Sequence, residues 1–170
     1  GHLALCWDSG PSWRLDIDPD YKANRTPAPP EEEESKHSVF RLMREWASLN
    51  NLFSFSARGF EADDLIAGFA NLSRNSGHKV WVISGDKDLL QLVEEPLVVQ
   101  IRPTSGMNPD QEVWDQGRVI ATCGAAQSSL TLINTLVGDS SDNIRGVSGI
   151  GPKTAAKLVE ASQGSIEALV

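Results

Sequence analysis

Strand patterns alternate with helix patterns along the first hundred residues, and this alternation restricts the possible folds more than any other feature. Short apolar or β-branched runs predict strands over Leu3–Trp7, Leu52–Ala57, Lys79–Ser84 and Leu97–Ile101. Apolar residues at helical spacing predict helices over Ser35–Leu49 and Glu61–Arg74. Such alternation is typical of a parallel sheet covered by helices, so we predict an α/β fold.

The chain divides into two regions on its pattern. After about Trp114 the strand signals stop and helical patterns follow, interrupted by a glycine-rich turn over Gly138–Gly151. We therefore predict an α/β core over residues 1–127 and a helical region over residues 128–170. Within the core, Tyr21–Glu34 carries a proline cluster and four glutamates without apolar anchors, which predicts an exposed, mobile connection.

Composition is that of an ordinary globular protein, with 40% hydrophobic and 22% charged residues in 170. No apolar run approaches the roughly 20 residues that span a bilayer, and the start is too soon acidic for a signal peptide, so we expect a cytoplasmic location. The two cysteines, Cys6 and Cys123, are expected to be reduced core thiols. The net charge of −8 at first argues against nucleic acid as a partner.

Acidic residues gather at the ends of the predicted elements. They are Asp8, Glu61, Asp63, Asp64, Asp86, Asp88, Asp139 and Asp142. Because the carboxyl ends of parallel strands meet at one crevice, we expect these side chains to converge. Converging carboxylates repel one another unless cations neutralise them, and hard oxygen ligands favour Mg²⁺ or Mn²⁺ over zinc. The pattern predicts a site for more than one metal ion.

Each acidic cluster also has a purely structural interpretation. Glu61 and Asp64 share a helix face, and acidic residues in a first turn are favoured by the helix dipole. Asp86 and Asp88 could both reach one cation from a tight turn, but the same residues could begin a capped helix. Neither cluster is specific by itself.

The segment Gly149-Ile150-Gly151-Pro152-Lys153 is the most specific local pattern. Its glycines allow backbone N–H groups to approach a phosphate, Pro152 suits a first helical turn, and Lys153 and Lys157 add positive charge. This is the logic of a helix-hairpin-helix that grips a DNA backbone without reading bases. An ordinary Gly-Pro turn before a helix is the weaker alternative.

Five motifs in order resemble the 5′ nuclease or flap endonuclease family of bacteria and bacteriophages. They are Asp8, Tyr21-Lys22-Ala23-Asn24-Arg25, Glu61-Ala62-Asp63-Asp64, Gly85-Asp86-Lys87-Asp88-Leu89, and Gly138-Asp139-Ser140-Ser141-Asp142-Asn143-Ile144 through Lys157. The resemblance implies a PIN-like or resolvase-like, mostly parallel central sheet flanked by helices, followed by a helix-hairpin-helix region. It also implies Mg²⁺-dependent hydrolysis of phosphodiester bonds near DNA 5′ ends, in replication, repair and RNA primer removal.

The resemblance assigns roles to individual residues. The eight carboxylates match the family's metal ligands, two or more Mg²⁺ ions being expected with Mn²⁺ as a substitute. Lys22 and Arg25 match the basic pair that contacts the scissile phosphate, at the foot of an arch over residues 21–36. Catalytic roles fall to Lys22, Arg25, Asp8, Asp64 and Asp86. The expected DNA contacts are Tyr21 by stacking, Lys22, Arg25, Gly149, Ile150, Gly151, Lys153, Thr154 and Lys157.

Cofactors and partners follow from the same resemblance. A K⁺ ion is expected at the main-chain carbonyls around Val147–Ile150. The expected partners are 5′ flaps, nicked or 5′-ended duplexes and RNA/DNA primer junctions, bound by a monomer in a bacterial cell or a phage-infected host. The net charge then argues less strongly against DNA as a partner, because the eight site carboxylates carry as much negative charge as the net −8 of the whole chain.

One departure from the family and two alternatives stay open. Family members begin with a further strand, ending in a metal-binding aspartate, that has no counterpart before Leu3, so we expect the family core to be N-terminally incomplete here. A PIN-type ribonuclease would explain the carboxylates but not Gly146–Lys157. A non-catalytic DNA-binding fragment of a larger nuclease or polymerase would explain the hairpin.

Overall fold

The structure is a computed structural model that describes residues 1–103, 111–165 and 168. Its contacts divide the chain into two compact units. The first comprises Gly1–Ile66 with Ser141–Asn143, and the second comprises Ala67–Ser140 with Ile144–Val170. The boundary falls inside helix α3 (Ala62–Asn75). The boundary at residue 127 remains a prediction from the sequence.

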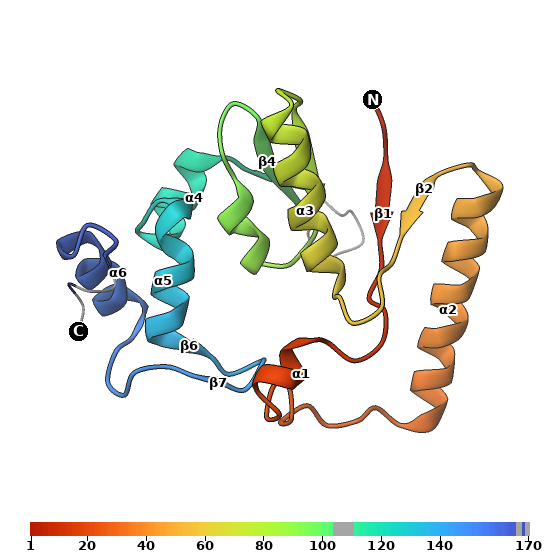
Figure 1. The fold of residues 1–170 in the computed structure, drawn as a ribbon, viewed down its shortest axis with the longest axis horizontal. Coiled ribbons are helices and arrows are strands. Elements are labelled where there is room, and N and C mark those ends of the chain that lie inside the picture. Colours follow the sequence, from red (N-terminus) through yellow and green to blue (C-terminus); the bar gives the residue numbers. More distant parts are fainter. Residues whose placement is uncertain (104–110, 166–167, 169–170) are drawn as a thin grey trace. The chain divides into compact units, whose positions relative to one another are not determined.

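The first unit is built on a pair of parallel strands. Strand β1 (Ala4–Cys6) pairs with β2 (Phe53–Phe55) in parallel register, Ala4 opposite Phe53 and Cys6 opposite Phe55. Helices α1 (Arg14–Ile17) and α2 (Pro30–Leu49) form the connection between them (Figure 1). The pairing extends past β1, because the Trp7 indole donates to the Ser54 hydroxyl at 2.6 Å. The predicted parallel connection is thus confirmed here.

Helix α2 begins earlier than the sequence pattern indicated, so the prediction of an irregular connection through Glu34 is wrong for its last residues. Pro30 occupies the first helical turn, where its fixed φ and missing N–H are tolerated. The glutamates that follow lie at the positive end of the helix dipole. Lys36 also pairs with Glu32 one turn away at 2.6 Å. These local interactions favour a helix even without apolar anchors.

The second unit contains a three-stranded sheet in the order β3 (Val80–Ile83), β4 (Val98–Pro103), β5 (Gln111–Trp114). Strand β3 runs parallel to β4, as predicted. Strand β5 is antiparallel to β4 and was not predicted, since the run Gln-Glu-Val-Trp buries only Trp114. A short 3-10 helix, η1 (Asp88–Leu92), follows β3.

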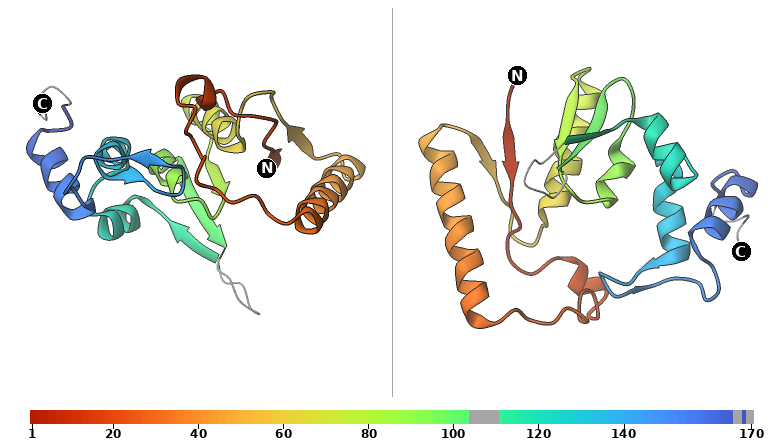
Figure 2. Two further views of the ribbon diagram at one scale, coloured as in Figure 1. Left: turned by 90° about the horizontal axis from the view of Figure 1, so that it is seen from below. Right: turned by 180° about the vertical axis from the view of Figure 1, so that it is seen from behind.

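Helices dominate the C-terminal third, as predicted. They are α4 (Gln116–Cys123), α5 (Gln127–Val137) and α6 (Pro152–Ala161), with α6 packed on α5 (Figures 1 and 2). The expectation that no strand occurs after Trp114 is wrong, because β6 (Gly138–Asp139) pairs antiparallel with β7 (Ile144–Arg145). A Cβ on Gly138 would lie 2.3 Å from the Gly146 nitrogen, so this close pairing requires glycine.

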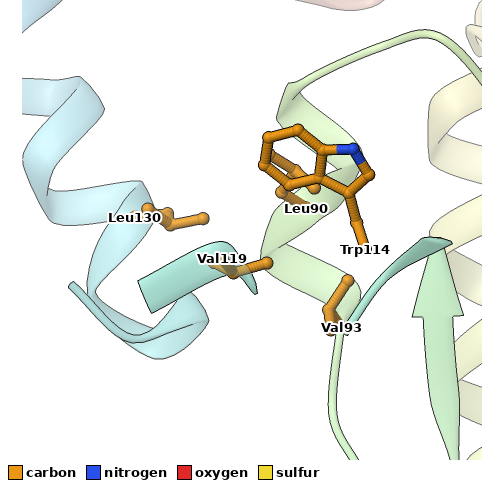
Figure 3. Packing of buried hydrophobic residues seen from close by; sticks show 5 residues of the cluster. All are labelled: Leu90, Val93, Trp114, Val119 and Leu130. Carbon is orange, nitrogen blue, oxygen red and sulfur yellow. The ribbon is translucent and has the colours of Figure 1, made fainter. Parts of the chain in front are cut away.

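Two apolar clusters hold the second unit together. In one, Trp114 and Val119 pack with Leu90 and Val93 of the η1 region and Leu130 of α5 (Figure 3). In the other, Ile133 of α5 packs against Ala155 and Val159 of α6. Cys6 and Cys123 are both free thiols, and Cys123 packs against the first cluster. Among the described residues, no helix has the length and apolarity needed to cross a membrane.

Truncating Leu130 should measure the contribution of the first cluster. Leu130 is 8% exposed. We expect Leu130→Ala to lower the free energy of unfolding by about 2–4 kcal/mol, because the lost methyl groups leave a cavity among packed side chains. Leu72→Ala in α3 is the matched control, since that leucine is 66% exposed and should change stability by less than about 0.5 kcal/mol. Urea unfolding followed by circular dichroism compares the two, and equal losses would contradict the packing described.

Candidate active site

Asp8 stands two residues after the end of β1, and its carboxylate accepts a hydrogen bond from the backbone of the next acidic cluster. Its Oδ1 accepts a hydrogen bond from the Ala62 N–H at 2.7 Å, at the first residue of α3. The peptide of Asp8 is also held, because Arg44 donates to its carbonyl at 3.4 Å. Asp8 therefore caps α3, which positions Glu61, Asp63 and Asp64 close to the end of β1.

Arg14 engages Asp64 with both arms of its guanidinium group. Its Nη1 lies 2.9 Å from Asp64 Oδ2 and its Nη2 lies 2.8 Å from Oδ1. The Glu61 N–H also donates to Asp64 Oδ2, at 3.0 Å. The hydrogen bonds from Arg14 are the main cause that lowers the pKa of Asp64, so this carboxylate is ionised and fixed in direction. The sequence reasoning missed Arg14, which lies in a four-residue helix outside every motif.

Tyr21 joins Glu61 to Asp142. Its hydroxyl lies 3.2 Å from Glu61 Oε2 and 3.1 Å from Asp142 Oδ2. Burial is the main cause that raises the pKa of Tyr21 to about 12, so the phenol stays protonated and can donate to one carboxylate at a time. The side chain is 7% exposed and its ring lies 4.7 Å from the Lys22 ammonium. Stacking on a base, the role expected for Tyr21, would require the ring to leave this position.

Lys22 lies against both of these carboxylates, and Arg25 lies against Asp142. The Lys22 ammonium is 3.0 and 2.9 Å from the two oxygens of Glu61 and 4.0 Å from Asp142 Oδ2. Arg25 Nη2 lies 2.6 Å from Asp142 Oδ1. The backbone supports this contact, because Lys22 adopts φ +59° and its N–H donates to the Asp142 carbonyl at 2.9 Å. The structure thus brings together residues from three sequence motifs, among them Arg25 and Asp142, which lie 117 positions apart.

The donor set of Glu61 and Asp142 suits a hard divalent cation. Both carboxylates face the Lys22 ammonium, which stands in for a cation at that point. Within the part of the chain that the structure describes, no three acidic, histidine or cysteine side chains come close enough to form a complete metal site. Mg²⁺ does not require one, since it is commonly bound by one or two carboxylates together with water and substrate phosphate. The residues present therefore fit such an ion.

Asp63 lies in the first turn of α3 in the first unit, and the other three predicted carboxylates belong to the second unit. Asp86 and Asp88 follow β3, and the Asp88 N–H donates to Asp86 Oδ1 at 2.8 Å. The Asp86 N–H in turn donates to the Ser84 hydroxyl at 3.1 Å. Asp139 lies in β6, where its Oδ2 is 3.9 Å from the Lys87 ammonium. Each unit is a compact body with its own carboxylates, so the convergence of all eight on one crevice remains a prediction.

The hairpin before α6 has the predicted local geometry. Gly149 adopts φ +80°, and the Ile150 N–H closes a turn onto the Val147 carbonyl at 3.1 Å. Gly151 is the N-cap of α6 and Pro152 occupies its first turn. On this helix Lys153, Thr154 and Lys157 are exposed, while Ala155 and Val159 are buried against α5. The basic side chains and the free N-terminal N–H groups of α6 therefore face solvent.

Comparisons with known proteins identify the family. Residues 1–124 match the family described as "5'-3' exonuclease, N-terminal resolvase-like domain", and residues 126–170 match "5'-3' exonuclease, C-terminal SAM fold". Together these matches extend over nearly the whole chain. The chain belongs to the 5′-3′ exonuclease and flap endonuclease family of nucleases, as the motifs indicated.

Individual relatives agree with this membership. A 5′-3′ exonuclease of Bacillus subtilis is 38% identical over 159 residues, which cover 93% of this chain and 51% of the relative. DNA polymerase I of Rhizobium leguminosarum is 36% identical over 178 residues, covering 99% of this chain and 16% of the polymerase. The crystal structure of a bacteriophage T5 flap endonuclease with DNA and metal ions matches with a TM-score of 0.76 and 26% identity, over 95% of this chain and 60% of that one. The chain thus spans about half or less of its curated relatives.

The Arg14–Asp64 pair should give the metal-free protein a defined dependence on pH. In EDTA at neutral pH we expect Asp64→Asn to lower the free energy of unfolding by about 1–2 kcal/mol, because a charge-assisted, two-armed hydrogen bond is lost. The pKa of Asp64 is lowered in the folded state. The contribution of ionised Asp64 to the free energy of unfolding is therefore fully present above the ordinary aspartate pKa of about 3.9. It is lost as pH falls through the lowered pKa of Asp64 in the folded state.

The measurement is urea unfolding of both proteins at pH about 6 and at pH about 3, which lies below the ordinary aspartate pKa of about 3.9. The difference in free energy of unfolding between wild type and Asp64→Asn should be clearly smaller at the lower pH. Asp16→Asn, which makes the same change at an exposed aspartate of α1, controls for the loss of one negative charge. A difference of the same size at both pH values would contradict an ionic pair.

Proposed function

We propose that this chain is the core of a Mg²⁺-dependent nuclease that hydrolyses phosphodiester bonds near the 5′ ends of DNA. The observation that carries the proposal is the convergence of Lys22, Arg25 and Tyr21 on Glu61 and Asp142. A basic pair next to a carboxylate pair is the arrangement that phosphodiester hydrolysis needs, since one side of the reaction requires a cation and the other requires a grip on phosphate. Membership of the exonuclease family supports the same reaction.

The residues divide the work between them. Lys22 and Arg25 bind oxygens of the scissile phosphate and offset the negative charge that develops there. Tyr21 lies between Glu61 and Asp142 and orients whichever of the two accepts its hydroxyl hydrogen. Glu61 and Asp142, with Asp8, Asp63, Asp64, Asp86, Asp88 and Asp139 in the assembled protein, are the proposed ligands of two or more Mg²⁺ ions, directly or through water. When bound, the ions supply Lewis acidity and activate water at neutral pH, so no general-base side chain is required.

The hairpin and α6 supply the second part of the function. Main-chain N–H groups of Gly149–Gly151 with Lys153, Thr154 and Lys157 would hold the backbone of a duplex without reading its bases. A K⁺ ion at the carbonyls around Val147–Ile150 would strengthen that grip. The proposed substrates are 5′ flaps, nicked or 5′-ended duplexes and RNA/DNA primer junctions, bound by a monomer in the bacterial cytoplasm. The T5 flap endonuclease, whose structure was solved with DNA and metal ions, is the relative that supports this choice.

A flap-cleavage assay tests the proposal. A 5′-labelled flap DNA is incubated with the protein in Mg²⁺, in Mn²⁺ and in EDTA. We expect 5′ products only with a divalent ion, and we expect Asp142→Asn to lower the rate about a hundredfold or more, because it removes a carboxylate that faces the cation position. Asp16→Asn, the same change at an exposed site outside the cluster, should cleave at the wild-type rate.

The other outcomes of this assay separate the alternatives. Metal-dependent cleavage of single-stranded RNA, without preference for a 5′ flap, would replace the proposal with a PIN-type ribonuclease. Absence of cleavage in every metal, with DNA binding that weakens as salt rises, would leave a non-catalytic DNA-binding module. Cleavage that persists in EDTA would contradict the metal requirement.

The hairpin has its own test in the salt dependence of binding. Each phosphate contact by a lysine releases about 0.9 counterion from duplex DNA. We therefore expect the double variant Lys153→Gln and Lys157→Gln to reduce the slope of log K against log salt by about 2, with similar losses on unrelated sequences. Lys79→Gln, at an exposed lysine before β3, is the control and should leave the slope unchanged. Fluorescence anisotropy over a salt series gives both slopes, and an unchanged slope in the double variant would remove the hairpin from the DNA interface.

A further inference from the structure

Gln100 is an unusual residue for the middle of a buried strand. It lies in β4, opposite Val82 of β3 and Trp114 of β5, and its side chain is 0% exposed. The other buried residues among those the structure describes are hydrophobic. Long polar side chains are rarely buried to this degree unless their polar atoms are satisfied. The contacts of its amide group should therefore explain why a glutamine is buried here.

The amide nitrogen of Gln100 donates to two carbonyls of the turn that follows β3. Its Nε2 lies 2.9 Å from the Ser84 oxygen and 2.6 Å from the Asp86 oxygen. A primary amide has two N–H groups, so both hydrogen bonds form at once. Gln100 thus ties together the first and last residues of the segment Ser84–Asp86.

Arg102 completes this arrangement from the same face of β4. Side chains two positions apart on a strand point to the same side. The Arg102 Nη2 donates to the Gly85 carbonyl at 2.8 Å, between the two carbonyls that Gln100 holds. Its guanidinium group lies 5.0 Å from the centre of the Trp114 ring, which limits its movement. Three consecutive carbonyls are therefore held by two adjacent side chains.

The oxygen of Gln100 argues against a purely structural role. Its Oε1 is buried and accepts no hydrogen bond from any residue that the structure describes. An unsatisfied buried oxygen destabilises a fold, whereas Met or Leu would fill the same space without that cost. The buried neighbours of Gln100 on β4, Val98 and Ile101, are apolar. Glutamine at this position is explained by what its N–H groups do for the turn.

We propose that Gln100 and Arg102 act as a carbonyl clamp that positions Asp86 for metal binding. The clamp is defined by these two residues and the carbonyls of Ser84, Gly85 and Asp86. The turn beneath it directs the Asp86 carboxylate, whose Oδ1 accepts the Asp88 N–H. Gln100 is a positioning residue that acts through the backbone, and its effect on metal affinity rests on the nuclease function proposed above. Outer groups of this kind commonly set ligand orientation in metal sites.

The test is Gln100→Met in the full chain, with two readouts that do not depend on cleavage. Amide hydrogen exchange by NMR at Asp86 and Asp88 reports the order of the turn, and we expect it to accelerate by at least about tenfold. Mn²⁺ binding by calorimetry reports the ligands, and we expect the affinity to fall by about tenfold. The melting temperature, measured alongside, shows whether the variant is folded, because the substitution removes two hydrogen bonds as well as the unsatisfied oxygen. Gln111→Met, the same change at an exposed position of β5, is the matched control.

A second variant and the wild type keep the outcomes distinct. Arg102→Gln removes one of the three carbonyl contacts from a half-buried site. It should accelerate amide exchange and weaken Mn²⁺ binding as Gln100→Met does, but to a smaller extent. If Gln100→Met does not fold, Arg102→Gln tests the carbonyl clamp in its place. Unchanged exchange at Asp86 and Asp88 would overturn the clamp, and faster exchange with unchanged Mn²⁺ affinity would overturn its role in positioning a ligand. Absence of Mn²⁺ binding to the wild type, with faster exchange in Gln100→Met, would instead reject the proposed metal-dependent function and leave the clamp intact.

Discussion

Repulsion between neighbouring carboxylates is the constraint on which the rest of the first unit depends. Glu61 and Asp142 both contact the Tyr21 hydroxyl, Asp64 accepts the Glu61 N–H, and each of the three carboxylates is paired with a basic side chain. Arg14 holds Asp64, Lys22 holds Glu61 and Arg25 holds Asp142. Ion pairs at exposed surfaces contribute little to stability, but these carboxylates are only 17–19% exposed, where opposite charges are screened less. Charge balance, together with the burial of Tyr21, therefore explains why the Tyr21–Arg25 segment lies where it does.

This balance links the electrostatics to the chemistry. The cations that offset Glu61 and Asp142 are the side chains proposed to bind phosphate, so the same groups serve two partners. A divalent ion between the carboxylates would compete with Lys22 for Glu61, and Lys22 would then be available to a phosphate oxygen. Arg14 differs, because both its arms are committed to Asp64 and its guanidinium lies 5.0 Å from the Trp13 ring. It neutralises the site without being released.

Much of the fold was predictable because its signals are local. The alternation of apolar runs gave the parallel pairs β1–β2 and β3–β4, and the glycine and proline pattern gave the start of α6. The start of α2 was not predicted, because its first turn is stabilised by dipole and ion-pair terms rather than by an apolar stripe. Strands β5, β6 and β7 were missed because β6 and β7 have only two residues each and β5 buries only Trp114, so none of them carries an apolar run that predicts a strand.

The candidate site likewise contains residues that the sequence predicts and residues that only the structure identifies. Motifs named the carboxylates and the basic pair, because their order and spacing carry information within one sequence. Arg14 and Gln100 have no such context, and their roles follow only from which oxygens they reach in three dimensions. The aromatic character of Tyr21 suggested stacking, whereas its burial and its hydroxyl contacts place it between two carboxylates. A side chain with both a ring and a polar end cannot be assigned from its type alone.

Asp8 shows why structural and chemical interpretations of an acidic residue need not compete. Capping α3 uses one carboxylate oxygen, Oδ1, and leaves the second oxygen with its own capacity to accept hydrogen bonds or bind a cation. The N–H that it accepts fixes the direction in which that second oxygen points. A cap therefore supplies the rigidity that a metal ligand requires, since a carboxylate that rotates freely must be ordered when the ion binds. On this argument the helix-dipole interpretation of the acidic clusters is a precondition of their chemistry, because the same N-terminal N–H groups that favour aspartate also orient it.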